Sequence, residues 1–542
     1  MRQFFTLSTL SILILLGCNP SKEEYKCNTN AQKLSGEYAP FALTTNTSHL
    51  SDNQKELLPI LFEVADIMDE LYWKQAWGDK EDLLSRITDD HLREITLINY
   101  GPWNRLDGQK SFIVNIPKKS LGAELYPKDM HKEEFDQFLS PIKTSNFSLI
   151  KRDSLGALKA IPYHIAYKAS LQKASTLLLK AASLAEDSKF KAYLTKRAKS
   201  LITDEYYESD IAWMDIADSK IDFVVGPIEN YEDQLYGYKT SYEGIVLIKD
   251  ERQSEQLDQL ISILPELQKT LPVAEAYKSE VPSLHSKLGI YDMIYSQGDG
   301  NAAGKTIAIN LPNDAKIRNT KGSRQMLLRN AMRAKFDKIV IPITREVIVK
   351  EQQQYVNFDA FLQNTIFIHL ANSLGMRQTL DGDKTVAESL KEHYTTIESC
   401  KADILSLYLL SNTQELGEDH DIKNNYVTIM ADIFRSLRFG EASNSGKANM
   451  IRFNYFCQYG AFEKDMITGK YQVNFEKMNE AMKNLATKLL TIEGDGDYQK
   501  ASELIEDLAI VPADLKADLV KIRNAGIPRD IVFEQGIDQL EL

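Results

Sequence analysis

The chain has 542 residues, with 64 Lys and Arg against 77 Asp and Glu, and its formal net charge is −13. Its 43% hydrophobic and 26% charged residues are ordinary for a globular protein, which excludes the disordered and fibrous classes. A nucleic-acid binder needs a basic face, so this acidic balance argues against nucleic acid as a partner. Four cysteines in so long a chain also exclude a disulfide scaffold.

The first residues have the pattern of a bacterial lipoprotein signal peptide. An apolar run from Phe4 to Leu16 follows Arg2, and a glycine and Cys18 end it. The run is shorter than the ~20 apolar residues that cross a bilayer. A charged start, an apolar middle and a small-residue end are typical of a cleaved signal. We therefore expect residues 1–17 to be removed and Cys18 to carry lipid. An ordinary cleaved signal or a cytosolic start is the alternative.

Lipid on Cys18 would place the protein in the bacterial cell envelope, anchored to the membrane (outer membrane, periplasmic or surface-exposed). The polar residues that follow are expected to form a tether, so residues 18–51 are interpreted as a lipid-anchored tether and lead-in segment. Three cysteines remain, and an odd number far apart favours free thiols over bridges: Cys27, Cys400 and Cys457.

The rest of the chain has a mixed middle part and a helical end. Helical periodicity covers residues 52–100, and two helices broken near Asp187 cover residues 165–206. Short apolar runs then predict strands at residues 221–225, 244–248, 290–295, 306–309 and 338–343. Helices are predicted after Glu346 at roughly 356–374, 384–411, 422–438, 446–457, 473–492 and 497–524.

This order predicts an α+β fold that is mainly helical. Residues 52–345 are expected to form mainly a strand-containing lower lobe, and residues 346–542 a helical lobe. Residues 298–306, Gly-Asp-Gly-Asn-Ala-Ala-Gly-Lys-Thr, imitate a phosphate-binding loop, but Asp299 occupies the position of its first glycine. A strand-like run follows where the motif needs a helix N-terminus. We therefore expect no nucleotide site there.

Several segments occur together in a specific order. The first is Gly-Pro-Ile-Glu-Asn-Tyr-Glu-Asp at 226–233, and the second is Ile-Asn-Leu-Pro-Asn at 309–313. The third is a pair, Phe-Ile-His-Leu-Ala-Asn-Ser-Leu-Gly at 367–375 and Ile-Glu-Ser-Cys-Lys-Ala-Asp at 397–403. Their order and spacing resemble the dipeptidyl peptidase III family of zinc exopeptidases, in its bacterial branch. The resemblance implies two lobes around a cleft, a helical lobe that holds zinc and a strand-containing lobe that binds peptide.

The zinc motifs of that branch are degenerate in this chain. The resemblance implies His-Glu-x-x-His-x-x-Gly on one helix, with both histidines on zinc and the glutamate as base, and a third ligand from a glutamate on a later helix. The three ligand positions read Ile368, Asn372 and Ser399, and the base position reads His369. Ile368 has no donor atom, and neutral oxygens bind zinc poorly. We therefore expect no metal cofactor, although the family uses zinc.

A further departure concerns the transition-state histidine that the resemblance implies. Ser445 and Asn449 stand where this residue is sought, and neither is a histidine. His369 has two interpretations. It is a packed core histidine, or it belongs to a rebuilt metal site, although a ligand shifted by one helical residue is rotated by about 100°. The acids and bases available to such a site are His393, Glu398 and Asp403.

The peptide-binding residues of the family are retained. A carboxylate with side-chain amides recognises a free N-terminal ammonium through charge-assisted hydrogen bonds. By the resemblance, Glu229 binds the amine, Tyr231 supports it, Asn310 and Asn313 hold the peptide backbone, and Arg452 is a cleft arginine that meets a carbonyl or carboxylate. The alternative for Glu229 and the two asparagines is that they cap turns.

We favour a catalytically inactive, lipid-anchored, dipeptidyl peptidase III-like protein that binds peptides with a free N-terminus in the cleft between its lobes. The lost ligand positions beside a retained amine-binding group motivate this hypothesis. The alternative is an active zinc-dependent hydrolase, a peptidase with a remodelled metal or non-metal site. A purely structural envelope protein is the third interpretation.

Overall fold

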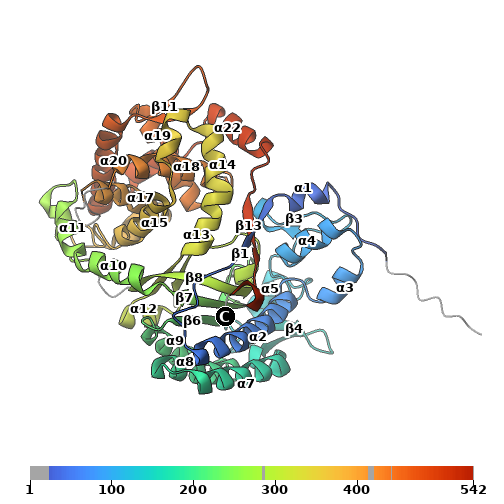
Figure 1. Cartoon of the computed structure of the whole chain (residues 1–542). Coiled ribbons are helices and arrows are strands. Elements are labelled where there is room, and N and C mark those ends of the chain that lie inside the picture. The colour runs from blue at the N-terminus through green and yellow to red at the C-terminus, as the bar shows by residue number, and fades with distance from the viewer. Residues whose placement is uncertain (1–22, 283–286, 413–419, 441, 541–542) are drawn as a thin grey trace, which may run out of the picture.

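The computed structural model describes residues 23–282, 287–412, 420–440 and 442–540. The chain forms a strand-containing lobe and a helical lobe (Figure 1), which confirms the predicted α+β, mainly helical, two-lobed fold. The expected signal peptide, residues 1–17, and Cys18 lie outside the described residues. Among the residues that are described, no helix is both long enough and apolar enough to cross a bilayer.

A five-stranded sheet forms the centre of the first lobe, with strand order β6-β7-β8-β10-β9. β6 pairs antiparallel with β7, β7 with β8, and β10 with β9, while β8 and β10 run parallel. β6 and β7 are buried along nearly their whole length, as expected for strands covered on both faces. The strands are β6 (Ile221–Glu229), β7 (Ser241–Lys249), β8 (Lys287–Gly298), β9 (Ala308–Leu311) and β10 (Arg324–Leu328).

Helix α2 (Asp52–Ala76) packs on this sheet, and α7 (Lys168–Leu184) packs on α2 and on α8 (Ser188–Leu201) (Figure 1). A capping box between Ser51 and Gln54 starts α2. A Cβ added at Gly244 of β7 would lie 2.8 Å from Ala65 of α2, so glycine permits this close approach. The predicted helix pair with a break near Asp187 is confirmed, because Asp187 caps α8.

The other elements of the N-terminal part surround the sheet. They are α1 (Ala31–Ser35), β1 (Tyr38–Ala42), α3 (Lys80–Ser85), α4 (Asp90–Asn99), β2 (Trp103–Asn104), β3 (Lys110–Ser111), α5 (Lys132–Gln137), β4 (Ser148–Arg152), β5 (Leu158–Pro162), α6 (Tyr163–Ala166), α9 (Tyr207–Asp215), α10 (Glu251–Ser262), α11 (Leu264–Thr270) and α12 (Ala315–Lys321). The segment expected as a tether contains α1, and the Tyr25 amide donates to the Arg86 carbonyl at 2.7 Å.

The second lobe is almost entirely helical. Pro512, at the N-cap of α22, divides the predicted helix 497–524 into two. The elements are α13 (Arg329–Lys335), α14 (Ile341–Val347), α15 (Phe358–Ala371), α16 (Val386–Leu390), α17 (Tyr394–Asn412), α18 (Ile422–Leu437), α19 (Asn444–Gln458), β11 (Phe462–Lys464), β12 (Tyr471–Val473), α20 (Phe475–Asp495), α21 (Tyr498–Leu508) and α22 (Ala513–Asn524). The final strand, β13 (Asp530–Glu534), returns to pair parallel with β1.

The predicted strand at residues 338–343 is wrong. A π-helical turn, Phe336–Val340, joins α13 to α14, and Ile339, Val340 and Ile343 are buried. Periodicity alone does not distinguish a short, buried, β-branched run in a helix from a strand. The sequence pattern also missed β10, whose segment Arg-Gln-Met-Leu-Leu has no β-branched residue.

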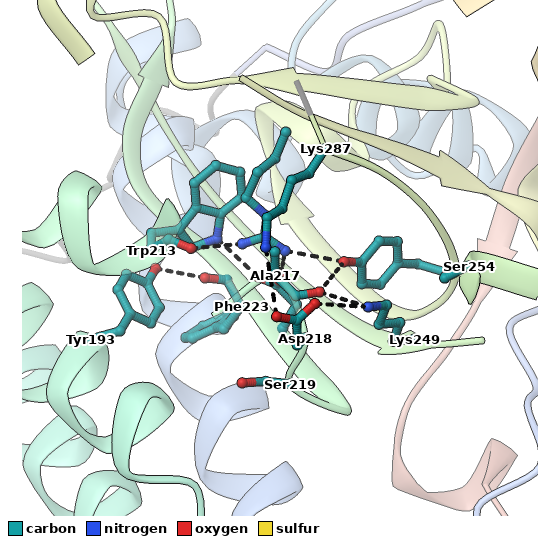
Figure 2. Close-up of polar contacts among 12 residues, drawn as sticks. Tyr193, Trp213, Ala217, Asp218, Ser219, Phe223, Lys249, Ser254 and Lys287 are labelled. Carbon is teal, nitrogen blue, oxygen red and sulfur yellow. Dashed lines mark hydrogen bonds and ion pairs between the residues drawn. The ribbon is translucent and has the colours of Figure 1, made fainter. Parts of the chain in front are cut away.

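A buried ion pair connects parts of the sheet that are not neighbours in strand order. Arg324 of β10 contacts Asp222 of β6, and both side chains are fully buried. The Arg324 Nη1 group donates to the Trp213 carbonyl at 2.8 Å, and Trp213 Nε1 donates to Asp222 Oδ1 at 2.9 Å. Figure 2 shows Trp213 and also Tyr193, whose hydroxyl donates to the Phe223 carbonyl at 2.6 Å. Because β7 and β8 lie between β6 and β10, the sheet must curl to bring this pair together.

Candidate functional site

Glu229, the last residue of β6, is the centre of the residues that are predicted to bind peptide. Its side chain is half-buried, and burial raises the pKa of its carboxyl group, while hydrogen bonds from Asn313 and Tyr231 oppose that rise. Tyr231 is 70% exposed, and the charge of Glu229 is the main cause that raises its pKa. The structure therefore brings three of the predicted residues together. Asn310 lies in β9 with its side chain exposed.

The loop that presents Tyr231 is held by the two acids that follow it. Glu232 is buried, and its Oε2 atom lies 2.9 Å from Arg105 Nη1 and accepts the Tyr72 hydroxyl at 3.0 Å. Burial raises the pKa of Glu232, but Arg105 and Lys119 outweigh this and lower it to about 2. Asp233 accepts several backbone N–H groups of its own loop, those of Leu235, Tyr236, Tyr238 and Lys239. Both acids position the loop and are already paired, so neither is free for a ligand.

Two further acids next to Glu229 escaped the sequence analysis. Glu243 of β7 is buried, and burial, with the nearby charges of Asp299 and Glu229, raises its pKa well above the usual range. Burial and the charge of Glu232 raise the pKa of Asp299 to about 6. Such an acidic neighbourhood favours a positively charged ligand group beside Glu229. The available signal was Glu243 itself, a charged residue inside an otherwise apolar strand.

The degenerate metal positions lie on two helices that pack against each other, α15 and α17. Ile368 and His369 are in the last turn of α15, and Asn372 is its exposed C-cap. Ser399 lies in α17 and is partly buried, whereas Ser445 is exposed in the first turn of α19. Ile368 packs against the hydrophobic core. The structure thus places an apolar side chain and two neutral polar ones at the three ligand positions.

These residues do not fit a zinc ion. A catalytic zinc site uses three protein ligands of His, Asp, Glu or Cys type. The described part of the chain contains no cluster of three such side chains able to hold a metal. Burial lowers the pKa of His369 to about 4, so its imidazole is neutral at pH 7. A single imidazole does not replace the donors that Ile368, Asn372 and Ser399 lack.

Glu398, the residue before Ser399, is bound to a buried lysine. Lys401 Nζ donates to Glu398 Oε2 at 2.8 Å and to the Leu374 carbonyl at 3.0 Å, and it lies 3.3 Å from Glu493 Oε2. Burial opposes the charge, but Glu493 and Glu398 outweigh it and raise the pKa of Lys401. Burial also raises the pKa of the Cys400 thiol. A raised pKa makes this cysteine a poor nucleophile.

Arg452 is buried within the helical lobe. It lies 2.9 Å from Asp403 Oδ2 and contacts Asn449, whose amide donates to Ser436 Oγ at 2.8 Å. Burial raises the pKa of Asp403, and Arg452 opposes that rise. The Nε and Nη1 groups of Arg452 have no hydrogen-bond partner among the described residues, so this network uses only part of its donors.

In the loop whose sequence resembles a phosphate-binding motif, backbone N–H groups bind the carboxylate of Asp530, near the C-terminus. The backbone N–H groups of Gly304 and Lys305 donate to Asp530 Oδ2 at 2.9 and 2.7 Å. Strand β9, not a helix, follows the loop. The local structure therefore has neither the free N–H groups nor the helix N-terminus that phosphate binding needs.

Comparisons with known proteins agree with this fold. A family model described as peptidase family M49 matches residues 151–369. The chain is 35% identical to dipeptidyl peptidase III from Caldithrix abyssi, with a TM-score of 0.88 over 94% of this chain and 99% of that one. It is 30% identical to dipeptidyl peptidase III from Corallococcus sp. strain EGB, with a TM-score of 0.76 over 93% and 96% of the two chains.

A relative from Arabidopsis thaliana is not named as a dipeptidyl peptidase III. The chain is 32% identical to Nudix hydrolase 3 of that plant over 584 residues, which cover 94% of this chain and 75% of the plant protein. The match to the family model includes Glu229, Asn310 and Asn313, and it ends at His369, in the last turn of α15.

Proposed function

The chain belongs to peptidase family M49, the dipeptidyl peptidase III family, and from this premise we propose that it binds peptides by their free N-terminus without hydrolysing them. The cluster of Glu229, Tyr231 and Asn313 supports peptide binding. Its half-buried carboxylate, with two hydrogen-bonding neighbours, suits an ammonium group. Asp299, whose pKa is raised to about 6, keeps most of its charge at pH 7 and adds negative potential at the same place.

The proposal that hydrolysis is lost rests on the residues at the three expected zinc-ligand positions. Zinc lowers the pKa of its bound water and thereby makes the nucleophile of such peptidases. Ile368, Asn372 and Ser399 supply none of the donors that would hold the ion. The nearby acids are already paired, Glu398 with Lys401 and Asp403 with Arg452.

Metal analysis and turnover on one preparation test this proposal. We expect the purified full chain in detergent to contain no stoichiometric zinc and to leave an arginyl-arginyl fluorogenic substrate intact, while titration calorimetry detects binding of an unmodified peptide. Stoichiometric zinc together with turnover would refute the proposal. Turnover that His369→Ala abolishes would instead support the alternative, an active hydrolase with a remodelled site.

We also propose that lipid on Cys18 anchors the protein in the bacterial cell envelope. The signal-like pattern of residues 1–17 is the main support. The chain is bound to the fold from Tyr25 onward, and the seven steps from Cys18 span at most about 25 Å. The folded body would therefore sit close to the membrane surface.

Fractionation of cells tests the anchor. We expect the Cys18→Ala variant to leave the membrane fraction, while Cys27→Ala, a matched change at a cysteine of the folded part, stays in it. Mass spectrometry of the mature N-terminus should find a lipidated cysteine. An unmodified Cys18 in membrane-bound protein would contradict this part of the proposal.

A further inference from the structure

A cavity of about 750 Å³ lies behind the peptide-binding residues, between α8, α9 and the ends of β6 and β9. Its volume is in the range of ligand-binding cavities, ~300–1,000 Å³. Of the predicted peptide-binding residues of this lobe, Asn313 lines it, whereas Glu229, Tyr231 and Asn310 do not. Its walls are largely aromatic and apolar, and they include Phe147, Tyr193, Tyr206, Tyr207, Trp213 and Pro312. Tyr193 and Trp213 are both labelled in Figure 2.

A buried arginine with unused hydrogen-bonding capacity lies in this wall. The side chain of Arg197 is only 6% exposed, and its Nη2 group donates to Asp210 Oδ1 at 2.5 Å. Its Nε group is buried without a hydrogen-bond partner among the described residues. The guanidinium also lies 5.3 Å from the ring centre of Tyr206. Arg197 lines the cavity, and a guanidinium in an aromatic setting suits a carboxylate of a ligand.

Four acids line the same cavity, Glu205, Glu208, Asp210 and Asp314, and the last two lie near Arg197. Burial raises the pKa of Asp210, and the nearby charge of Asp314 raises it further, while Arg197 opposes the rise. Asp314 caps α12, and its Oδ1 atom accepts the N–H groups of Lys316 and Ile317 at 2.7 and 3.2 Å. A cation near two neighbouring carboxylates is favoured by the charge of both. An ammonium group has the size and charge for this position.

We propose that this cavity binds a small zwitterion with an aromatic side chain, a free aromatic amino acid or a short aromatic peptide. Its carboxylate meets Arg197, its ammonium lies between Asp210 and Asp314, and its ring packs against Tyr206 and Trp213. Both charged ends are needed, because the cavity offers both signs of charge on apolar walls. Asn313 lines this cavity and also hydrogen bonds Glu229, so the two sites share one side chain.

Titration calorimetry on the full chain in detergent tests the proposal with defined probes. L-Tryptophan and the dipeptide Ala-Trp distinguish the two sources of the zwitterion, and at least one of them should bind. Tryptamine, which lacks the carboxylate, and indole-3-propionate, which lacks the ammonium, should each bind at least about tenfold more weakly. No binding of either zwitterion at about 1 mM, or equal affinity for all the probes, overturns the proposal.

Variants locate the binding. Arg197→Met should weaken L-tryptophan at least about tenfold and leave tryptamine unchanged, and Asp314→Asn, which keeps the helix cap, should weaken tryptamine and leave indole-3-propionate unchanged. Because Arg197→Met leaves Asp210 unpaired and risks misfolding, Asn146→Trp at the exposed rim provides a second block of the cavity. Arg252→Met, on the exposed face of α10, is the matched control. Binding that survives Asn146→Trp but is lost in Glu229→Gln places the ligand at the peptide-binding residues instead and overturns the proposal.

Discussion

The side-chain amide of Asn313 donates a hydrogen bond to the carbonyl oxygen of Ile228 at 3.1 Å. Ile228 lies in β6 and Asn313 directly follows β9, and these two strands are at opposite ends of the strand order. The contact therefore depends on the curl of the sheet. Because Asn313 also hydrogen bonds Glu229, the place where the two edges meet is also the place where the peptide N-terminus is expected.

Replacing Asn313 tests this double role. Asn313→Ala removes a hydrogen bond that opposes the raised pKa of Glu229, so that pKa should rise further. We expect peptide affinity to fall about threefold to tenfold at pH 7, and the loss of affinity on acidification to begin at higher pH. Calorimetric titrations at several pH values measure both effects. Asn479→Ala, at an exposed position of α20, should change neither; an unchanged pH profile in Asn313→Ala would contradict the shared role.

Removing the charge of Glu229 tests recognition of the ammonium group. Glu229→Gln should weaken binding of a peptide with a free N-terminus about tenfold or more, because a charge-assisted hydrogen bond is lost. The N-acetylated form of the same peptide should bind wild type and variant equally weakly. Glu480→Gln, exposed in α20, is the matched control. If the acetylated peptide binds wild type as tightly as the free one, the amine is not what Glu229 recognises.

Restoring the family's zinc ligands tests whether their replacement is the reason that we expect no zinc to bind. The fourfold variant Ile368→His, His369→Glu, Asn372→His and Ser399→Glu supplies two imidazoles and a carboxylate as ligands, with a second carboxylate as base. We expect zinc content near stoichiometry by mass spectrometry after dialysis. His369→Glu alone should bind no more zinc than wild type, because it adds no ligand at the other positions. A fourfold variant that folds, as judged by circular dichroism, and stays metal-free would show that the helices no longer present these positions to one point.

His369 makes stability depend on pH. Burial lowers its folded-state pKa to about 4 from the usual 6.5, so the unfolded chain takes up the proton first as the pH falls through about 6.5. Wild type should therefore lose about 2 kcal/mol of unfolding free energy between pH 7 and pH 5 that His369→Gln retains. Urea unfolding at the two pH values measures this difference. His131→Gln, at an exposed position, is the control. If wild type and His369→Gln depend equally on pH, the imidazole of His369 is not the cause of the pH dependence.

The ion pair between Arg324 and Asp222 should dominate the stability of the curled sheet. Arg324→Met leaves Asp222 buried and without its charge partner, which costs about 3–5 kcal/mol. The double variant Arg324→Met with Asp222→Leu should recover part of that loss, because no uncompensated charge stays buried. Lys500→Met removes a solvent-exposed pair with Asp497 and should cost far less. Urea unfolding compares the three, and equal losses in single and double variants would contradict the argument.

Much of the secondary structure was readable from the sequence, because its signals lie within a few neighbouring residues. Asp187 marked the break between α7 and α8, since a cap acts on the next turn of its own chain. The segment at residues 338–343 was misread for the same reason: its local pattern suits both a strand and a buried helix, and only packing decides between them. The sequence alone likewise shows which atoms residues 368, 372 and 399 can offer to a metal ion.

Tertiary structure alone decided how distant segments meet. The packed sheet places the carboxyl of Glu229 beside Asn313 and buries Glu243 near it. It also places Arg197 and Asp314 at one cavity. These contacts join residues far apart in sequence, and their energies come from burial and from charges on other elements. The sequence by itself therefore determined which chemical groups are present and which are missing, whereas the packed fold determined which of them act on one another.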